Sequence, residues 1–236
     1  YGRLRVAYFA DTGEYVDPGL ARRMASWGPG RADVTEDDDE DPVTIPDLWG
    51  LRAQTWLTQA GTIRRESPIA LAIRQETQLT DSNHALVRPP RELAWALAMY
   101  VDSLAPPPAL TSPSPSPQRR RGGAVFRARC GGCHANAAYG GRVIPAAAIG
   151  TDPALATGRG RGTGGYRVPP LVRVRDGAPY LHDGSVASLD ELLSPARLAP
   201  GYSAGRLGPG PIPGHRAGTD LGPADRAALI DFLGTL

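Results

Sequence analysis

The alternation of hydrophobic and polar positions predicts a mainly α-helical protein with long irregular loops. Its clearest helix covers residues 91–104, where apolar side chains recur at the three- and four-residue spacing of one helix face. The expected buried face consists of Leu93, Leu97, Tyr100, Val101 and Leu104. Pro89 and Pro90 precede this segment and Pro106 follows it, so prolines bound the helix at both ends.

Two shorter segments beyond residue 118 also have helical spacing. Residues 122–129 are expected to form a helix with Val125 and Phe126 on its apolar side. A second helix is expected to begin at Pro223, because proline suits the first helical turn. Its apolar positions are Ala228, Leu229, Phe232 and Leu233. We expect the two helices to cross.

Between these helical regions the composition changes. Residues 112–117 alternate serine and proline, a pattern typical of an extended polyproline-type linker. The chain is long enough for two small domains. The sequence therefore predicts a domain over residues 1–105, a linker over 106–118 and a second domain over 119–236.

In the second predicted domain, the helix over residues 122–129 is followed by Cys130-Gly131-Gly132-Cys133-His134. Two thiols three positions apart and an adjacent imidazole form the attachment signature of haem c. The thiols add to the porphyrin vinyl groups, and the histidine becomes the axial ligand of the iron. A redox-active Cys-x-x-Cys pair would follow a strand, which the pattern does not predict here. A zinc site would need further ligands close by, and the sequence has no other cysteine.

The candidates for the ligand on the other side of the iron can be reduced by exclusion. The two methionines, Met24 and Met99, both precede the motif, so the haem domain supplies no thioether. His182 and His215 remain as candidates, beside an open or water-ligated iron. We favour His215, because the glycines on either side of it, at 214 and 218, give the backbone freedom to approach the ring. The predicted metal ligands are therefore His134 and His215.

A short, gapped internal repeat links the two halves of the chain. With an offset of 123, Ile45-Pro46-Asp47-Leu48 aligns with Val168-Pro169-Pro170-Leu171, and Gly61-Thr62-Ile63 aligns with Gly184-Ser185-Val186. With an offset of 132, Leu97, Tyr100, Val101 and Leu104 align with Leu229, Phe232, Leu233 and Leu236. The repeat predicts that the first domain is a cytochrome-like half without a haem motif of its own.

Charge is distributed unevenly along the chain. Residues 1–118 carry 11 arginines and 16 acids, whereas residues 119–236 carry 15 arginines and 8 acids. A basic haem half suits docking of an acidic redox partner, and a solvated face partly neutralised by haem propionates explains it equally well. No nucleic-acid recognition motif accompanies the charge, which argues against a nucleic-acid partner. No apolar run is long enough to span a membrane.

Six consecutive acids at residues 36–41 form the most charged stretch of the chain. Adjacent like charges repel one another and are typical of a solvated loop. Clustered carboxylates also bind calcium, which we keep as an alternative cofactor.

Five motifs in the second half resemble the di-haem cytochrome c peroxidase superfamily, in particular its rubber-oxygenase-like branch. They are Cys130-Gly131-Gly132-Cys133-His134, Ile149-Gly150-Thr151-Asp152-Pro153, Val168-Pro169-Pro170-Leu171, Ala178-Pro179-Tyr180-Leu181-His182-Asp183-Gly184-Ser185-Val186 and Gly214-His215-Arg216-Ala217-Gly218-Thr219-Asp220-Leu221. The resemblance implies two cytochrome c-like domains and a periplasmic or extracellular location. In this family one haem is catalytic, and the C-terminal haem usually relays electrons. The sequence departs from the family by lacking the first haem motif.

Two functions follow as expectations. The first is an electron-transfer c-type cytochrome with one covalent haem ligated by two histidines, whose partner is a redox protein or a second haem-bearing segment. The alternative is a haem peroxidase or oxygenase, or the relay part of one. We identify no catalytic residue in the haem domain, because a peroxidase needs an acid or base over an open iron and His215 is assigned as ligand.

Overall fold

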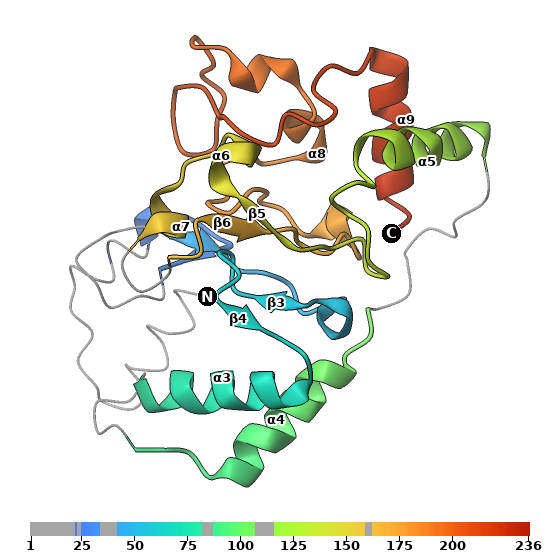
Figure 1. Cartoon of the computed structure of the whole chain (residues 1–236). Coiled ribbons are helices and arrows are strands. Elements are labelled where there is room, and N and C mark those ends of the chain that lie inside the picture. The colour runs from blue at the N-terminus through green and yellow to red at the C-terminus, as the bar shows by residue number, and fades with distance from the viewer. Residues whose placement is uncertain (1–21, 23–24, 34–41, 82–86, 107–115, 159–161) are drawn as a thin grey trace. The chain divides into compact units, whose positions relative to one another are not determined.

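A computed structural model describes residues 22, 25–33, 42–81, 87–106, 116–158 and 162–236 (Figure 1). Met24 and the acidic run at 36–41, with its calcium alternative, lie outside these residues. The chain separates into two compact units. The motif unit comprises residues 47–176 and 213–236, and the loop unit comprises residues 1–46 and 177–212. The predicted division at residues 106–118 stays a prediction.

The motif unit contains the longer helices. Its helices are α3 (Pro68–Asp81), α4 (Arg91–Ser103), α5 (Pro117–Arg129), α6 (Ala146–Ile149), α7 (Ala154–Thr157) and α9 (Pro223–Leu233), with 3-10 turns η1 (Leu51–Ala53) and η2 (Val174–Asp176). The predicted mainly α fold with irregular loops is confirmed. None of the helices in the described residues combines the length and apolar character required to cross a bilayer.

The strands are short and occur in antiparallel pairs. In the motif unit β3 (Trp56–Leu57) pairs with β4 (Ile63–Arg64), and β5 (Val143–Pro145) pairs with β6 (Gly165–Arg167). In the loop unit β1 (Arg31–Ala32) pairs with β2 (Val43–Thr44), and the short helices α8 (Leu189–Leu192) and η3 (Pro195–Leu198) follow. Strands of two or three residues are too short for a two-residue periodicity to be recognised in the sequence.

Helices α5 and α9 cross as predicted (Figure 1). The Oγ of Ser116 caps α5 by accepting a hydrogen bond from the backbone nitrogen of Arg119 at 3.0 Å. At the crossing, the rings of Phe126 and Phe232 have centroids 5.4 Å apart. Gly122 is buried there, and a Cβ at this position would lie 2.0 Å from the carbonyl oxygen of Ala228. Only glycine lets the helices approach so closely.

Helix α4 covers residues 91–103 as predicted, but the prediction of its buried face was wrong. Apart from Val101, the residues that face α3 and the small core around Leu51, Leu57 and Leu71 are alanines, Ala94 and Ala98. The larger side chains assigned to the core are solvent-exposed in the cases of Leu93, Leu97 and Tyr100. The small residues face inward because they allow α3 and α4 to pack closely.

The internal repeat is also present in the backbone. Residues with positive φ recur 123 positions apart in three pairs: Gly50 with Arg173, Thr58 with Leu181, and Gly61 with Gly184. The turn η1 recurs as η2 at the same offset. The antiparallel pairing of Leu57 with Ile63 recurs as the bridge between Tyr180 and Val186. Each copy therefore uses the same local turn, although the side chains differ.

Candidate haem site

The attachment motif continues directly from the C-terminus of α5. The backbone nitrogens of Cys130 and Gly131 donate to the carbonyl of Phe126, and those of Cys133 and His134 donate to the carbonyl of Cys130. These bonds fold the motif into a tight turn. Cys130 is half-buried, Cys133 is exposed, and neither forms a disulfide. Both thiols are therefore available for thioether bonds.

His134 is held in the orientation of a metal ligand. Its Nδ1 lies 2.6 Å from the carbonyl oxygen of Tyr139. A carbonyl only accepts hydrogen bonds, so Nδ1 carries the proton and Nε2 keeps its lone pair for a metal. Burial lowers the pKa of His134, opposed by hydrogen bonds to the carbonyls of Tyr139 and Pro169. The lowered pKa favours the neutral form of the imidazole, which is the form that binds metals.

His215 lies opposite His134 in the same unit. The two ring centroids are 6.5 Å apart, with the ring planes at 69°. The backbone reaches this position through two consecutive left-handed residues, Gly214 with φ 85° and His215 with φ 43°. The backbone nitrogen of His215 donates to the carbonyl of Ile149 at 3.1 Å. A Cβ at position 214 would lie 2.6 Å from that of Thr151, so glycine is required there.

The spacing of the two imidazoles fits one metal ion between them. Metal–imidazole bonds are about 2 Å long, and each ring centroid lies roughly 1 Å beyond its nitrogen. Two imidazoles on opposite sides of one ion therefore have centroids about 6 Å apart. The observed 6.5 Å between His134 and His215 matches this arrangement. The donor set, two thiols and two imidazoles, suits a haem c.

Aromatic rings form an apolar wall beside His134. The ring of Phe126 packs edge-on against Tyr139 at 5.6 Å and lies 6.4 Å from the His134 ring. Phe126 is buried, and its contact with Phe232 connects the wall to α9. Such a wall excludes water from an apolar cofactor.

His182 was the other histidine considered as a ligand from the sequence. His182 belongs to the loop unit, where its backbone carbonyl accepts a hydrogen bond from the nitrogen of Thr44 at 2.9 Å. It follows Leu181, which has a positive φ of 67° in a tight turn. Met99 is partly exposed on α4.

A buried polar network was not anticipated from the sequence. Arg167 on β6 is buried, and its Nη1 donates to Oε1 of Gln54 at 2.5 Å while its Nε donates to the carbonyl of Thr58 at 2.8 Å. Burial lowers the pKa of Arg167 to about 10, and the nearby carboxylate of Asp47 opposes this. The network ties β6 to the segment around β3. The available signal was an arginine between Tyr166 and Val168, two residues expected to be buried.

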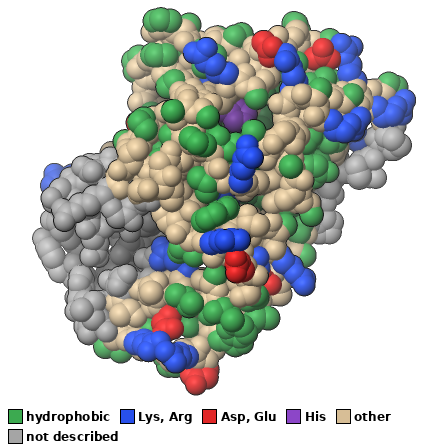
Figure 2. Space-filling model, viewed as in Figure 1, with side chains coloured by type: hydrophobic (Ala, Val, Ile, Leu, Met, Phe, Trp, Pro, Cys, Tyr) green, Lys and Arg blue, Asp and Glu red, His purple; other side chains and the backbone are tan. Residues whose placement is uncertain are grey.

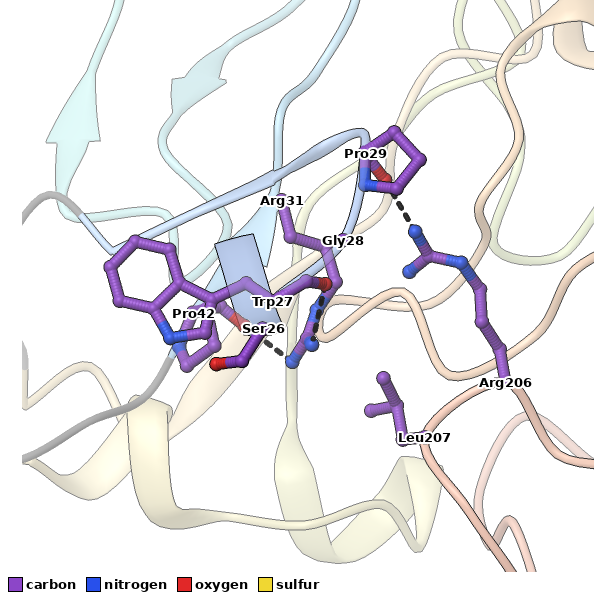
Figure 3. A pocket seen from close by; sticks show the side chains of 8 residues that line it. All are labelled: Ser26, Trp27, Gly28, Pro29, Arg31, Pro42, Arg206 and Leu207. Atoms are coloured by element: carbon purple, nitrogen blue, oxygen red, sulfur yellow. Dashed lines mark hydrogen bonds between the residues drawn. The ribbon is translucent and has the colours of Figure 1, made fainter. Parts of the chain in front are cut away.

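The loop unit contains a pocket lined by Ser26, Trp27, Gly28, Pro29, Arg31, Pro42, Arg206 and Leu207 (Figure 3). The guanidinium of Arg31 donates to the carbonyls of Trp27 and Pro42. That of Arg206 donates to the carbonyls of Pro29 and Gly184. Both cations thus brace the backbone, and none of the predicted haem ligands lines this pocket.

Comparison with known proteins bears on the fold of the chain. Residues 165–200 match a family described as RoxA-like, cytochrome c-like. A solved structure described as a MauG-like protein associated with microbial copper homeostasis aligns with a TM-score of 0.59 and 18% identity, over 89% of this chain and 77% of that chain. No curated protein matches the sequence significantly. The resemblance to the di-haem cytochrome c peroxidase superfamily is confirmed, which supports a haem c protein.

Proposed function

We propose that the chain is an electron-transfer cytochrome that holds one haem c through Cys130 and Cys133, with His134 and His215 as axial ligands. The observation that carries this proposal is the 6.5 Å separation of the two imidazole rings. When bound, the haem supplies one-electron redox chemistry. Two histidine ligands leave the iron no open position for substrate, so the reaction is electron relay.

The protein side chains orient and tune the ligands. The hydrogen bond from Nδ1 of His134 to the Tyr139 carbonyl fixes the ring and makes Nε2 a stronger donor. The contact of His215 with the Ile149 carbonyl anchors the second ligand through the backbone. Two imidazoles stabilise oxidised iron more than a histidine and a methionine do, so we expect a low reduction potential.

The alternative is a peroxidase or oxygenase with an open position at the iron. The resemblance of the sequence motifs to the di-haem cytochrome c peroxidase superfamily is the reason for this alternative. It would require His215 to lie near the iron without binding it. A base at that position would then assist proton transfer to a bound oxidant.

Replacing His215 with alanine is expected to convert a low-spin six-coordinate haem into a high-spin form that binds carbon monoxide. The ligand is removed, and no methionine follows Cys133 to replace it. Optical spectra of both oxidation states, with and without carbon monoxide, report the change. His182→Ala is the matched control and should keep the low-spin spectrum. Rapid carbon monoxide binding by the wild type, unchanged in His215→Ala, would favour the alternative function.

We further propose an acidic redox partner that docks beside the exposed Cys133. Several arginines of α5 are exposed on the approach to the motif: Arg120, Arg121, Arg127 and Arg129. Arg121 and Arg129 pair with Asp225 and Asp220. Among the described residues, Arg120 and Arg127 form no ion pair, so they carry the positive charge offered to a partner. Docking through these charges should weaken with salt. A second haem-bearing segment remains a second candidate partner, and a periplasmic or extracellular location follows from the c-type attachment.

A further inference from the structure

The loop that follows the attachment motif is held together by the side chain of Asn136. Its Oδ1 accepts hydrogen bonds from the backbone nitrogens of Ala138 at 2.9 Å and Gly140 at 2.7 Å. Its Nδ2 donates to the carbonyl oxygen of Ala53 at 2.9 Å. Because two donors meet Oδ1 and an acceptor meets Nδ2, the orientation of the amide is fixed. Asn136 therefore uses both ends of its side chain.

The bond to Gly140 determines the direction in which the carbonyl of Tyr139 points. The nitrogen of Gly140 and the carbonyl of Tyr139 belong to one peptide group, which is planar. In a trans peptide the N–H and the C=O point in opposite directions, and the cis bond of the described residues lies elsewhere, at Pro179. With the N–H held by Asn136, the C=O is directed at Nδ1 of His134, 2.6 Å away. Asn136 thus acts on His134 through one peptide group.

The backbone conformation of Tyr139 also needs support. Its φ is 57°, in the left-handed region that residues other than glycine adopt rarely. The nitrogen of Tyr139 donates to the carbonyl of Asn136 at 2.9 Å, so Asn136 holds the peptide groups on both sides of Tyr139. Two further bonds, from the nitrogens of Ala135 and Asn136 to the carbonyl of Gly140, complete the loop. Released from Asn136, Tyr139 would favour a negative φ, and its carbonyl would no longer be held toward His134.

These hydrogen bonds form a continuous chain from Ala53 to His134. In such a chain each amide is polarised by its neighbours, so a bond at one end strengthens the bond at the other. A stronger hydrogen bond from Nδ1 makes the imidazole a better electron donor to a metal. We infer that Asn136 is a positioning residue of the haem site, which sets the orientation and the strength of the hydrogen bond between His134 and Tyr139. This inference rests on the proposed function, in which His134 binds the iron.

The test replaces Asn136 with alanine in the His215→Ala background, where the proposed function leaves His134 as the protein ligand of the iron. Resonance Raman spectra of the reduced holoprotein then show the iron–histidine stretching vibration, whose frequency rises with the strength of the hydrogen bond donated by Nδ1. We expect Asn136→Ala to lower this frequency, because the Tyr139 carbonyl is no longer directed at the ring. In the protein that keeps His215, the same substitution should raise the reduction potential, because a weaker donor stabilises oxidised iron less.

Surrounding charges also influence the reduction potential of a haem. Figure 2 shows arginine side chains, in blue, gathered at the upper right of the view, where Figure 1 places α5 and α9. Asn136→Ala changes no charge, so their contribution stays the same. The matched control is Thr163→Val, which is also neutral and removes the hydrogen bond from Oγ1 of Thr163 to the carbonyl of Ala60 at 2.6 Å. It should lower the melting temperature and leave the vibration and the potential unchanged.

Asn136→Asp separates positioning from a change in stability. A carboxylate oxygen accepts hydrogen bonds as the amide oxygen does, so the bond from Gly140 is kept and the vibration should not fall below its frequency with asparagine. This variant carries the test if Asn136→Ala does not fold. The inference would be overturned if Asn136→Ala lost stability alone, as Thr163→Val does, or if Asn136→Asp lowered the frequency. A His215→Ala protein that stayed low-spin would contradict the proposed ligation instead, and the reduction potential would still test Asn136.

Discussion

Replacing both Cys130 and Cys133 with alanine is expected to abolish covalent haem completely. The two thiols are the cysteines of the chain, and both are free to form thioethers. Haem held only by His134 and His215 would dissociate when the protein unfolds. Intact mass and extraction into acidic organic solvent measure the loss. The folded protein should also melt at a lower temperature, because binding of the cofactor stabilises the native state.

The single variants refine this expectation. Cys133→Ala should keep one thioether through Cys130, so its haem should remain with the denatured polypeptide. His215→Ala serves as a control that alters axial ligation but leaves both thioethers in place. If haem stayed attached in the double variant, or if the wild-type mass were that of the polypeptide alone, the assignment of the motif as a haem c site would be wrong.

Replacing Gly122 with alanine is expected to destabilise the motif unit by about 2 kcal/mol or more, the range for an overpacked core. The added Cβ would lie 2.0 Å from the carbonyl oxygen of Ala228 and 2.7 Å from Cβ of Phe232. A backbone carbonyl cannot move aside as a flexible side chain does, so α5 and α9 would have to separate. Chemical denaturation of the holoprotein measures the change in free energy of unfolding.

Gly123 provides the matched control in the same helix. It is also buried, but a Cβ there would meet the ring of Phe232 at 3.4 Å, close to an ordinary contact. Alanine exceeds glycine in helix propensity by up to about 1 kcal/mol, so Gly123→Ala should be neutral or stabilising. Equal destabilisation by both substitutions would show that the crossing is not the cause.

The sequence predicted the parts of the fold that depend on local signals. Prolines and apolar spacing identified the helices now seen at 91–103 and 223–233, because these signals act within one helical turn. The helix predicted over residues 122–129 begins earlier, at Pro117, within the segment predicted as a linker. The buried face of α4 was predicted wrongly, because periodicity assigns large apolar residues to the core. On a helix that is apolar around most of its surface, tertiary contacts decide which side is buried. Here Ala98 is buried and Tyr100 is exposed.

The residues of the candidate site also differ in whether the sequence could predict them. Cys130, Cys133 and His134 follow from a contiguous motif whose spacing is set by the cofactor. His215 followed from exclusion, and the structure brings its ring opposite His134. The carbonyl of Tyr139 could not be predicted as the partner of His134. Every residue has a backbone carbonyl that accepts hydrogen bonds, whatever its side chain, so the sequence does not single one out.

The crossing of α5 and α9 bears on the order in which the protein is assembled. Arg119 and Asp231, which pair across it, are 112 residues apart in sequence. Bringing such distant segments together carries a loop-closure entropy cost, which slows folding. The haem motif lies at the end of α5, so its thiols are synthesised well before α9 and the His215 loop. The turn that carries the thiols is bonded to the end of α5 rather than to α9, so haem attachment does not require the opposite side to be closed first.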